Sequence, residues 1–496
     1  MSLDDKSVKK CFMTPVSLTG NSIFLPDGVE FKIGRSTELG VSDLTCSRHQ
    51  VTVKADYSKE IISVKTVGKN PSIWKKKLMI INKTYSLRSD HVIEIVPGKV
   101  LYKFSFSTIK CCLEKPKIMS YFWKMCGSEE LLMGISPGFD ESRAKVASFD
   151  LDGTLIKTKS GRVFAKDFDD WVLWDDSIKY ILRNLCSNNY KIVIFTNQAG
   201  LGTVSGKKKM SGFQKKIENI CNLLNVPVQI LAAVSYGLYR KPSPGMWYFM
   251  KERSKAADVK QSFYVGDAAG RPENWKDGKK ADFAASDRMF AINIGLKFYT
   301  PEEYFLNEPA ADYSRFKFHP GQKNNNKLPD LELPSTNQEV ILMVGLPGSG
   351  KSHFVKNYIE PHGYYVVSRD KSGTWQKCVS QLSEALKSHR NAVVDNVNPD
   401  RTSRERFIEI SKKYNVKVRC FCMDVPLEHC IHNNKFREIV DSEHEIIGSS
   451  LITSYNTNFE PPSMDEGFSS IVKIPFVPEF DNQEQEHFYY CFLVDK

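Results

Sequence analysis

In the first part of the chain, apolar residues occur in short runs that alternate with polar residues or are rich in branched side chains. The runs are Val51–Lys54, Ile61–Lys65, Val92–Val96 and Val100–Phe106. Turn-forming residues separate them, as at Pro26-Asp27-Gly28, and the apolar spacing typical of a helix does not recur. The pattern predicts a small all-β sandwich over residues 1–110.

The pattern changes at about residue 143. Short apolar strands are expected at Lys145–Phe149, Lys191–Phe195 and Ser262–Val265, with helical spacing between them. A second series is expected at Val340–Val344, Tyr364–Val367 and Ala392–Val394. Strands that alternate with helices indicate parallel sheets. We therefore expect a multi-domain protein in which two α/β domains, residues 143–325 and 326–496, follow the sandwich.

Two stretches are expected to be linkers. Residues 111–142 are poorly periodic and contain Gly, Pro and Ser, although Tyr121, Phe122 and Trp123 could pack on a neighbour. A polar run that begins at Pro320 separates the two α/β domains.

The composition is that of a globular protein. The 496 residues suggest about three domains at ~150 residues each. No apolar run approaches the ~20 residues that cross a bilayer, and the N-terminus lacks a secretion signal. We expect an intracellular monomer without a membrane partner, and its 12 cysteines to be reduced thiols. The net charge of +11 favours polyanionic partners only weakly.

Residues 345–352 carry the strongest motif of the chain. They read G-L-P-G-S-G-K-S, which matches the phosphate-binding pattern G-x-x-x-x-G-K-[ST], and an apolar strand leads into them. Backbone N–H groups around Gly345, Gly348, Ser349 and Gly350 are expected to surround phosphate oxygens. Lys351 would reach the β- and γ-phosphates of a nucleotide, and Ser352 its Mg²⁺.

A kinase also needs a group that orients the acceptor hydroxyl. Asp370 and Asp395 each follow a β-rich run, where ligands bind in open α/β sheets, although either carboxylate could instead be a helix cap or a surface group. Further on, Arg437 could supply charge from a lid or belong to a solvated helix face. His429, Cys430 and His432 are expected to be incidental residues of this helical segment and not a metal site.

A second chemical motif, Asp150-Leu151-Asp152-Gly153-Thr154, ends the strand at Lys145–Phe149. Two carboxylates two residues apart allow a division of labour. Asp150 can attack phosphorus and form an aspartyl-phosphate. Asp152 can protonate the leaving oxygen and then activate water.

Three later pieces fit the same chemistry. Thr196 offers a hydroxyl to a phosphoryl oxygen, and Lys241 offers a positive charge. Asp267 offers a carboxylate to Mg²⁺, a hard cation that prefers oxygen ligands. With Asp150 and Asp152 it is expected to complete a metal site.

These motifs carry resemblances to known families. Asp150 and Asp152, Thr196, Lys241 and Asp267 fall on the four motifs of the haloacid-dehalogenase phosphohydrolases. The last block resembles P-loop kinases. The strings TNQAG, RKPSPGMW, GDAAGR and SRDKSGTWQKC, in this order, make nearly the whole chain similar to the polynucleotide kinase 3′-phosphatase family, which heals DNA ends.

The resemblance implies roles for further residues. Asp370 would be the base for a DNA 5′-hydroxyl, with Asp395 nearby and Arg437 at the lid. Substrate contacts would come from Asn197, Arg240 and Arg369. A second acidic residue for the phosphatase metal remains open between Asp282 and Asp287. Backbone contacts to DNA are expected among Lys207–Lys209, Lys215, Lys216, Lys279 and Lys280.

The first block then resembles forkhead-associated domains, which bind phosphothreonine. Arg35, Ser47 and Arg48 fall on the positions that bind the phosphate, and Arg suits this role through its bidentate fork. The usual S-R-x-H pattern is altered here, because His49 directly follows Arg48 and Gln50 takes the fourth place.

The resemblance implies one combined function. The enzyme would remove 3′-phosphates and phosphorylate 5′-hydroxyls with ATP and Mg²⁺, so that broken strands can be ligated. The sandwich would recruit it, in the nucleus, to a threonine-phosphorylated acidic repair scaffold. Two alternatives remain at this stage: an enzyme for RNA ends or a small phosphometabolite, and a scaffold that has lost its activities.

Overall fold

The computed structural model describes residues 8–16, 23–25, 27–35, 41, 43–109, 121–254, 256–314, 316–322, 326–441 and 446–495. It forms two compact units, Met1–Lys117 and Ile118–Lys496. No helix in these ranges is long and apolar enough to cross a membrane.

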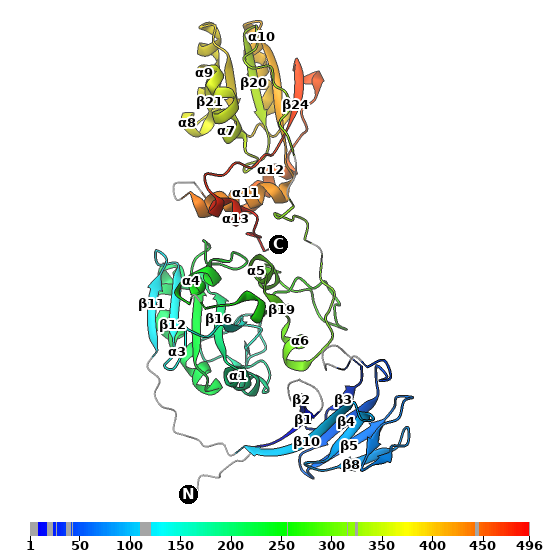
Figure 1. The fold of residues 1–496 in the computed structure, drawn as a ribbon. Helices are drawn as coiled ribbons and strands as arrows, with labels where there is room; N and C mark the ends of the chain where they lie inside the picture. Colours follow the sequence, from blue (N-terminus) through cyan, green and yellow to red (C-terminus); the bar gives the residue numbers. More distant parts are fainter. Residues whose placement is uncertain are drawn as a thin grey trace. The chain divides into compact units, whose positions relative to one another are not determined.

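The first unit is an all-β sandwich, as predicted (Figure 1). One antiparallel sheet has the order β2-β1-β10-β9-β6-β7 and the other has the order β3-β4-β5-β8. Alternate residues of β4 and β5 are buried, which is the pattern of strands with one face on a core. The strands are β1 (Val8–Pro15), β2 (Ile23–Leu25), β3 (Glu30–Ile33), β4 (Val51–Asp56), β5 (Ile61–Thr66), β6 (Ile73–Trp74), β7 (Lys77–Leu78), β8 (Thr84–Leu87), β9 (Val92–Val96) and β10 (Val100–Ile109).

The second unit begins with a seven-stranded sheet of order β11-β12-β17-β16-β13-β18-β19. Strand β13 lies inside the sheet, next to the middle strand β16, and pairs in parallel with β16 and β18. The strands are β11 (Phe122–Cys126), β12 (Leu131–Ile135), β13 (Lys145–Phe149), β16 (Tyr190–Asn197), β17 (Val228–Ala233), β18 (Phe263–Val265) and β19 (Lys297–Tyr299), with β14 (Ile156–Lys157) and β15 (Val172–Leu173) forming a separate hairpin.

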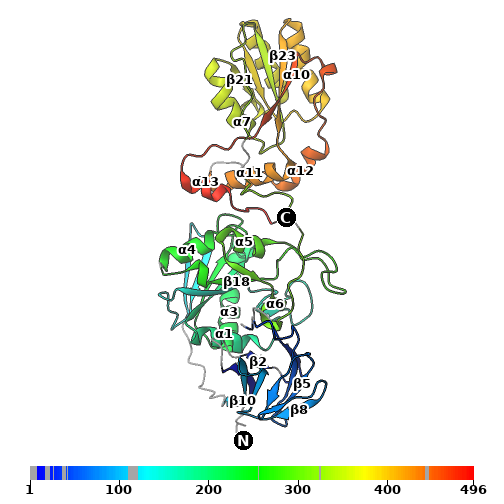
Figure 2. The same ribbon diagram turned by 45° about the vertical axis from the view of Figure 1, so that its right-hand side comes forward.

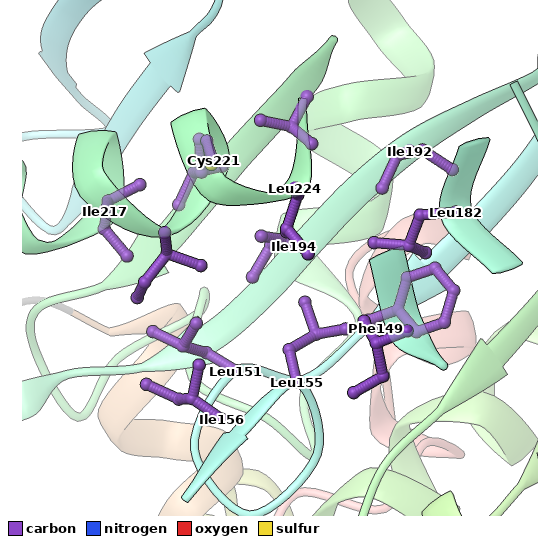
Figure 3. Packing of buried hydrophobic residues seen from close by; sticks show 14 of the residues in the cluster. Phe149, Leu151, Leu155, Ile156, Leu182, Ile192, Ile194, Ile217, Cys221 and Leu224 are labelled. Atoms are coloured by element: carbon purple, nitrogen blue, oxygen red, sulfur yellow. The ribbon is translucent and has the colours of Figure 1, made fainter. Parts of the chain in front are cut away.

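Helices cover both faces of this sheet. Leu182 of α1 and Ile217 of α3 pack with Phe149 and Ile194 on one face (Figure 3). Trp247 of α4 and Phe290 of α5 pack on the other. The helices are α1 (Ile178–Ser187), η1 (Ala199–Gly202), α2 (Val204–Lys207), α3 (Met210–Leu224), α4 (Gly245–Arg253), η2 (Val259–Gln261), α5 (Ser286–Ile294) and α6 (Pro301–Leu306).

The expectation of a linker at residues 111–142 is wrong where the structure describes that segment. Residues 111–120 lie outside the described residues, but β11 and β12 join the seven-stranded sheet through antiparallel pairs. Strand β12 is almost fully buried and β11 covers it as an edge strand. Gly134 is required there, because a Cβ atom would lie 2.4 Å from the ring of Trp123. The run Leu131–Ile135 therefore forms a buried strand. Its glycine, a residue that is rare in strands, hides this in the sequence pattern.

The last part of the chain is a parallel sheet of order β21-β22-β20-β23-β24. Helices α9 and α10 pack on one face of it, and α7 with η3 on the other. Figure 2 shows α7 and α10 beside the strands of this sheet. The elements are β20 (Glu339–Val344), α7 (Lys351–Phe354), η3 (Val355–Ile359), η4 (Glu360–His362), β21 (Tyr365–Ser368), α8 (Arg369–Ser372), α9 (Trp375–Lys387), β22 (Ala392–Asp395), α10 (Arg401–Lys413), β23 (Lys417–Asp424), α11 (Leu427–Val440), α12 (Ser449–Thr457), η5 (Met464–Glu466), β24 (Ser470–Pro475) and α13 (Gln483–Tyr489).

Candidate active sites

Asp150 stands directly after β13, at the carboxyl end of an interior strand. Its backbone N–H donates to the carbonyl of Val265 at 2.9 Å, which continues the ladder to β18 by one residue. The side chain is buried. The sequence therefore positions the expected nucleophile on a rigid strand end, where ligands bind in open α/β sheets.

The ammonium group of Lys241 makes four hydrogen bonds in this site. It donates to Asp150 Oδ1 at 2.6 Å, to Asp287 Oδ1 at 2.7 Å and to the hydroxyl of Tyr264 at 2.8 Å. It also donates to the carbonyl of Phe195 at 2.9 Å. The side chain is 2% exposed, so its charge is held by protein groups and not by water.

The carboxylates perturb one another. Burial, followed by the charge of Asp287, raises the pKa of Asp150 to about 7, against the opposing effect of Lys241. Burial, Asp150 and Asp287 raise the pKa of Asp267 well above its usual value. Burial alone would lower the pKa of Lys241, but Asp150 and Asp287 outweigh it and raise that pKa. Like charges crowded into a dry site raise the pKa of one another and make the site attractive to a cation.

Three carboxylates form that cluster: Asp150, Asp267 and Asp287 offer oxygen atoms that all lie within 4.8 Å of one another. Asp287 is therefore the acidic residue that joins Asp150 and Asp267. Gly266 leaves room for it, because a Cβ atom there would lie 2.5 Å from Asp287. Asp282 instead receives two hydrogen bonds from the guanidinium of Arg271, at 2.8 and 3.0 Å.

The donor set fits Mg²⁺. Three carboxylates that converge on one point provide the hard oxygen ligands that this ion prefers. Only one ammonium group, that of Lys241, balances them among the contacts described above. Asp267 is also approached by Gly153, where a Cβ atom would lie 2.3 Å from its carboxylate, so the glycine of the D-x-D-G-T motif makes room for the ligand set.

Asp152 lies beside this cluster, but its side chain is not one of the three grouped carboxylates, and its role at the metal site stays a prediction. Its side chain is 52% exposed and accepts hydrogen bonds from Gln198 at 2.8 Å and from Lys216 at 3.2 Å. Gln198 also donates to the hydroxyl of Thr196 at 3.0 Å. Gln198 and Lys216 were not predicted as parts of this site. Gln198 stood in the TNQAG string, whereas Lys216 was expected to contact DNA and is instead buried against Asp152.

Asn197 and Arg240 flank the lysine. The Asn197 amide donates to the backbone carbonyl of Lys241 at 3.0 Å and accepts from its N–H at 2.9 Å. The side chain thus fixes the Lys241 backbone. Arg240 lies over the ring of Tyr236, at 4.8 Å from its centroid. Substrate contacts by both residues remain predictions.

The phosphate-binding loop follows β20. Gly345, Gly348 and Gly350 all have positive φ angles, of 154°, 81° and 92°. Lys351 is buried and donates to the carbonyls of Gly345 at 2.9 Å and Leu346 at 2.8 Å. Burial lowers its pKa to about 8, against the opposing charge of Asp395. Carbonyl dipoles of the loop therefore hold this ammonium group.

Helix α11 packs on this loop. A Cβ atom at Gly348 would lie 2.2 Å from the carbonyl oxygen of Cys430, so only glycine fits. Asn433 donates to the carbonyl of Gly348 at 3.0 Å. Asn433 was not predicted, and nothing in its local sequence distinguishes it from a surface residue.

Asp395 ends β22, the neighbour of β20. Its Oδ1 atom is buried and has no hydrogen-bond partner. Burial raises the pKa of Asp395, and the Ser352 hydroxyl and the charge of Lys351 oppose that effect. The charges of Asp370 and Arg437 also act on Lys351. A buried, unpaired carboxylate oxygen near Ser352, and an ammonium group held by two carbonyls and the Ser349 hydroxyl, fit a nucleotide with its Mg²⁺.

Arg369 and Asp370 begin α8, directly after β21. The backbone N–H of Arg369 donates to the side chain of Asn396 at 2.8 Å, which ties α8 to the end of β22. His429 and His432 lie on α11, and His432 is bonded to the carbonyl of Tyr489 at 2.9 Å. Neither histidine belongs to a metal cluster among the described residues.

In the first unit, Arg35 and Ser47 lie on adjacent loops, and the Arg35 N–H donates to the carbonyl of Ser47 at 2.9 Å. Arg48 is exposed. Gln50 is fully buried and donates to the carbonyl of Asn70 at 2.6 Å and to the Ser72 hydroxyl at 3.0 Å, while the Ser47 N–H donates to its amide oxygen at 3.2 Å. Gln50 therefore fixes this loop.

These features define a class: a haloacid-dehalogenase-type phosphatase and a P-loop kinase in one chain, preceded by a forkhead-associated sandwich. Profiles of known families match the same parts. "Polynucleotide kinase 3 phosphatase" matches residues 145–305, "FHA domain" residues 11–79 and "AAA domain" residues 340–462.

Relatives extend over both enzymatic parts. The chain is 37% identical to the bifunctional polynucleotide phosphatase/kinase of Schizosaccharomyces pombe over 352 residues, 70% of this chain and 83% of that protein. A putative bifunctional polynucleotide phosphatase/kinase of Acanthamoeba polyphaga mimivirus is 35% identical over 67% of this chain and 85% of its own length. The chain belongs to the bifunctional polynucleotide phosphatase/kinase family.

The phosphatase part also has relatives of its own. A polynucleotide 3′-phosphatase of Saccharomyces cerevisiae is 30% identical over 34% of this chain and 89% of its own length.

Proposed function

We propose that this bifunctional enzyme heals DNA ends, with Asp150 as the phosphatase nucleophile and Lys351 as the nucleotide-binding lysine of the kinase. One observation carries the phosphatase assignment: Lys241 lies between Asp150 and Asp287 and holds one oxygen of the nucleophile. The net charge of +11 supports a nucleic-acid substrate.

In the phosphatase step, Lys241 binds Asp150 Oδ1, so Oδ2 is the oxygen that attacks phosphorus. The bond from phosphorus to the 3′ oxygen breaks, and that oxygen takes a proton from Asp152. Asp152 then accepts a proton from water, which attacks the aspartyl-phosphate and releases inorganic phosphate. Gln198 and Lys216 orient Asp152 for both proton transfers. Mg²⁺ held by Asp150, Asp267 and Asp287 would supply positive charge against the phosphoryl oxygens.

In the kinase step, Lys351 exchanges the carbonyls of Gly345 and Leu346 for the phosphates of ATP. Asp370 accepts the proton of the 5′-hydroxyl as that oxygen bonds to the γ-phosphorus, and ADP leaves. Arg437 faces the transferred group from α11. Ser352 and Asp395 would hold the Mg²⁺ that accompanies ATP.

The recruitment function rests on the sandwich. Arg35, Ser47 and Arg48 would bind a phosphothreonine in an acidic repair scaffold, and the enzyme would act in the nucleus as a monomer. A phosphothreonine peptide with acidic flanks, compared with its unphosphorylated form, tests the binding. Imaging of the tagged chain tests its location, and sedimentation tests its oligomeric state.

The test of the enzymatic function uses one DNA oligonucleotide with a 5′-hydroxyl and a 3′-phosphate, together with ATP and Mg²⁺. Asp150→Asn is expected to abolish only 3′-phosphate removal, and Lys351→Ala only 5′-phosphorylation. A matched RNA oligonucleotide separates DNA from RNA ends. If the native enzyme leaves both oligonucleotides unchanged but hydrolyses a generic phosphomonoester, the assignment to nucleic-acid ends is wrong.

A further inference from the structure

Asn293, near the end of α5, joins two segments that are far apart in the sequence. Its side-chain amide donates to the carbonyl of Pro242 at 2.8 Å and to the carbonyl of Phe492 at 2.8 Å. Its oxygen accepts from the N–H of Phe492 at 2.7 Å. One side chain thus binds the residue that follows the phosphatase lysine and the last residues of the chain.

The Lys241–Pro242 segment is therefore held from two sides. Asn197 fixes the backbone of Lys241, as described above, and Asn293 fixes the carbonyl of Pro242. The ammonium group of Lys241 must reach Asp150 and Asp287 from this backbone. A displacement of the segment would move that group relative to the nucleophile, and a misplacement of ~1 Å can reduce a rate on the order of 100-fold.

The C-terminal residues that Asn293 binds also pack on α5. Phe492 contacts Ala285 and Met289, and its ring lies 4.9 Å from that of Phe316 in an edge-on arrangement. The N–H of Ala285 donates to the carbonyl of Asp495 at 3.3 Å. Helix α5 also carries Asp287, so these terminal residues contact the element that supplies one carboxylate of the site.

Neighbouring residues of the same segment are anchored on the kinase side. Phe488, Cys491 and Leu493 pack with Phe436 and Ile439 of α11. Between Phe488 and Cys491, the Tyr489 hydroxyl donates to the side-chain oxygen of Asn433 at 2.7 Å. The C-terminal segment is thereby fixed at both ends, and its backbone at Phe492 is a defined partner for Asn293.

We propose that the terminal residues Phe492–Asp495 complete the phosphatase site, and that Asn293 is the positioning residue through which they fix Lys241. The phosphatase, although encoded in the middle of the chain, then depends on residues at the end of the kinase part. The proposal rests on the phosphatase assignment made above.

The test uses the full chain and p-nitrophenyl phosphate, which reports the chemistry of the site whether or not the substrate is a polynucleotide. Asn293→Ala and a chain that ends at Cys491 are each expected to lower kcat for this ester on the order of 10-fold to 100-fold, with little change in KM. Ile292→Ala, at the exposed neighbouring position, is the matched control. Asn293→Asp is a second variant: it keeps the acceptor for the Phe492 N–H but loses both donations.

A double mutant distinguishes positioning from general weakening. If Asn293 acts through the terminal residues, Asn293→Ala in the shortened chain reduces kcat no further than either change alone. An unchanged kcat in both Asn293 variants would overturn the proposal. The proposal would also be wrong if the two changes together reduced kcat by the product of their separate effects. It would be wrong as well if Asn293→Asp lowered the 5′-kinase activity and the Tm in parallel with kcat. If the native chain hydrolyses the ester but not DNA 3′-phosphates, only the assigned substrate is wrong.

Discussion

Lys241 lies 2.6 Å from Asp150, and the same ammonium group lies 2.7 Å from Asp287, so it contacts two of the three crowded carboxylates. Lys241→Met is expected to reduce phosphatase activity by about 1000-fold or more, because Asp150 loses the group that holds and orients it. It should also lower the free energy of unfolding by about 3 kcal/mol, since Asp150 and Asp287 stay buried without their partner. Phosphate release and urea unfolding measure the two effects.

Lys251→Met, on the exposed side of α4, is the control for that substitution and should change neither quantity. Kinase activity of Lys241→Met should remain near that of the native enzyme. An active Lys241→Met enzyme would show that Lys241 takes no part in the reaction.

Asp287 and Asp282 should respond differently to Mg²⁺. An ion that binds only the folded state raises the free energy of unfolding by about 2.7 kcal/mol at a concentration 100 times its Kd. We expect Mg²⁺ to raise the Tm of the native chain and of Asp282→Asn. The baseline Tm of Asp282→Asn is lower, because Arg271 loses one of its two carboxylate partners and keeps only Glu302. Asp287→Asn should lose this increment. Thermal unfolding with and without Mg²⁺ checks it, and an equal Mg²⁺ increment in all three proteins would exclude Asp287 as a ligand.

His432 should make the kinase part sensitive to acid. Burial, with a smaller effect of His429, lowers its pKa to about 3, whereas an unfolded histidine titrates near ~6.5. The unfolded chain therefore binds more protons between these values, so stability present above pH ~6.5 is lost as the pH falls. One such histidine contributes a loss of about 2 kcal/mol at pH ~5. His432→Gln should flatten the decrease of Tm between these pH values, and the exposed His362→Gln should not.

Gln50 should stabilise the loop that carries Ser47 and Arg48, the residues expected to bind a phosphothreonine. Gln50→Ala leaves the partners of a fully buried amide unsatisfied and is expected to destabilise the sandwich by about 2 kcal/mol. Arg48→Ala should abolish binding of a phosphothreonine peptide without changing Tm, because Arg48 is exposed. Calorimetry with the phosphorylated peptide, together with thermal unfolding, measures both. An equal loss of Tm in the two variants would contradict the assignment of a structural role to Gln50 and a binding role to Arg48.

The sequence predicted those site residues that follow strands directly. Asp150 comes after an apolar run, and the loop around Lys351 has a motif of its own, so each carries a local signal. Asp287 has none: it lies at the start of a helix, and Asp282 is as acidic and nearer to Asp267 in the sequence. Only the packing of α5 against Gly266 selects between them. Lys216 and Asn433 were missed for the same reason, because tertiary contacts alone bring them to the sites. Gln198 is different: it directly follows β16 and stands in the TNQAG string, but no role was assigned to it.

The position of β11 and β12 before the nucleophile strand has a practical consequence for dividing this enzyme. A fragment that starts at residue 143 would lack both strands and leave one side of β17 without its hydrogen-bonding partner. Bare strand edges recruit other chains, so such a fragment would aggregate or pair with itself. A phosphatase fragment that starts before Tyr121 keeps β12 paired with β17. About twenty residues that bear no catalytic group therefore decide whether the hydrogen-bonding groups of β17 are covered.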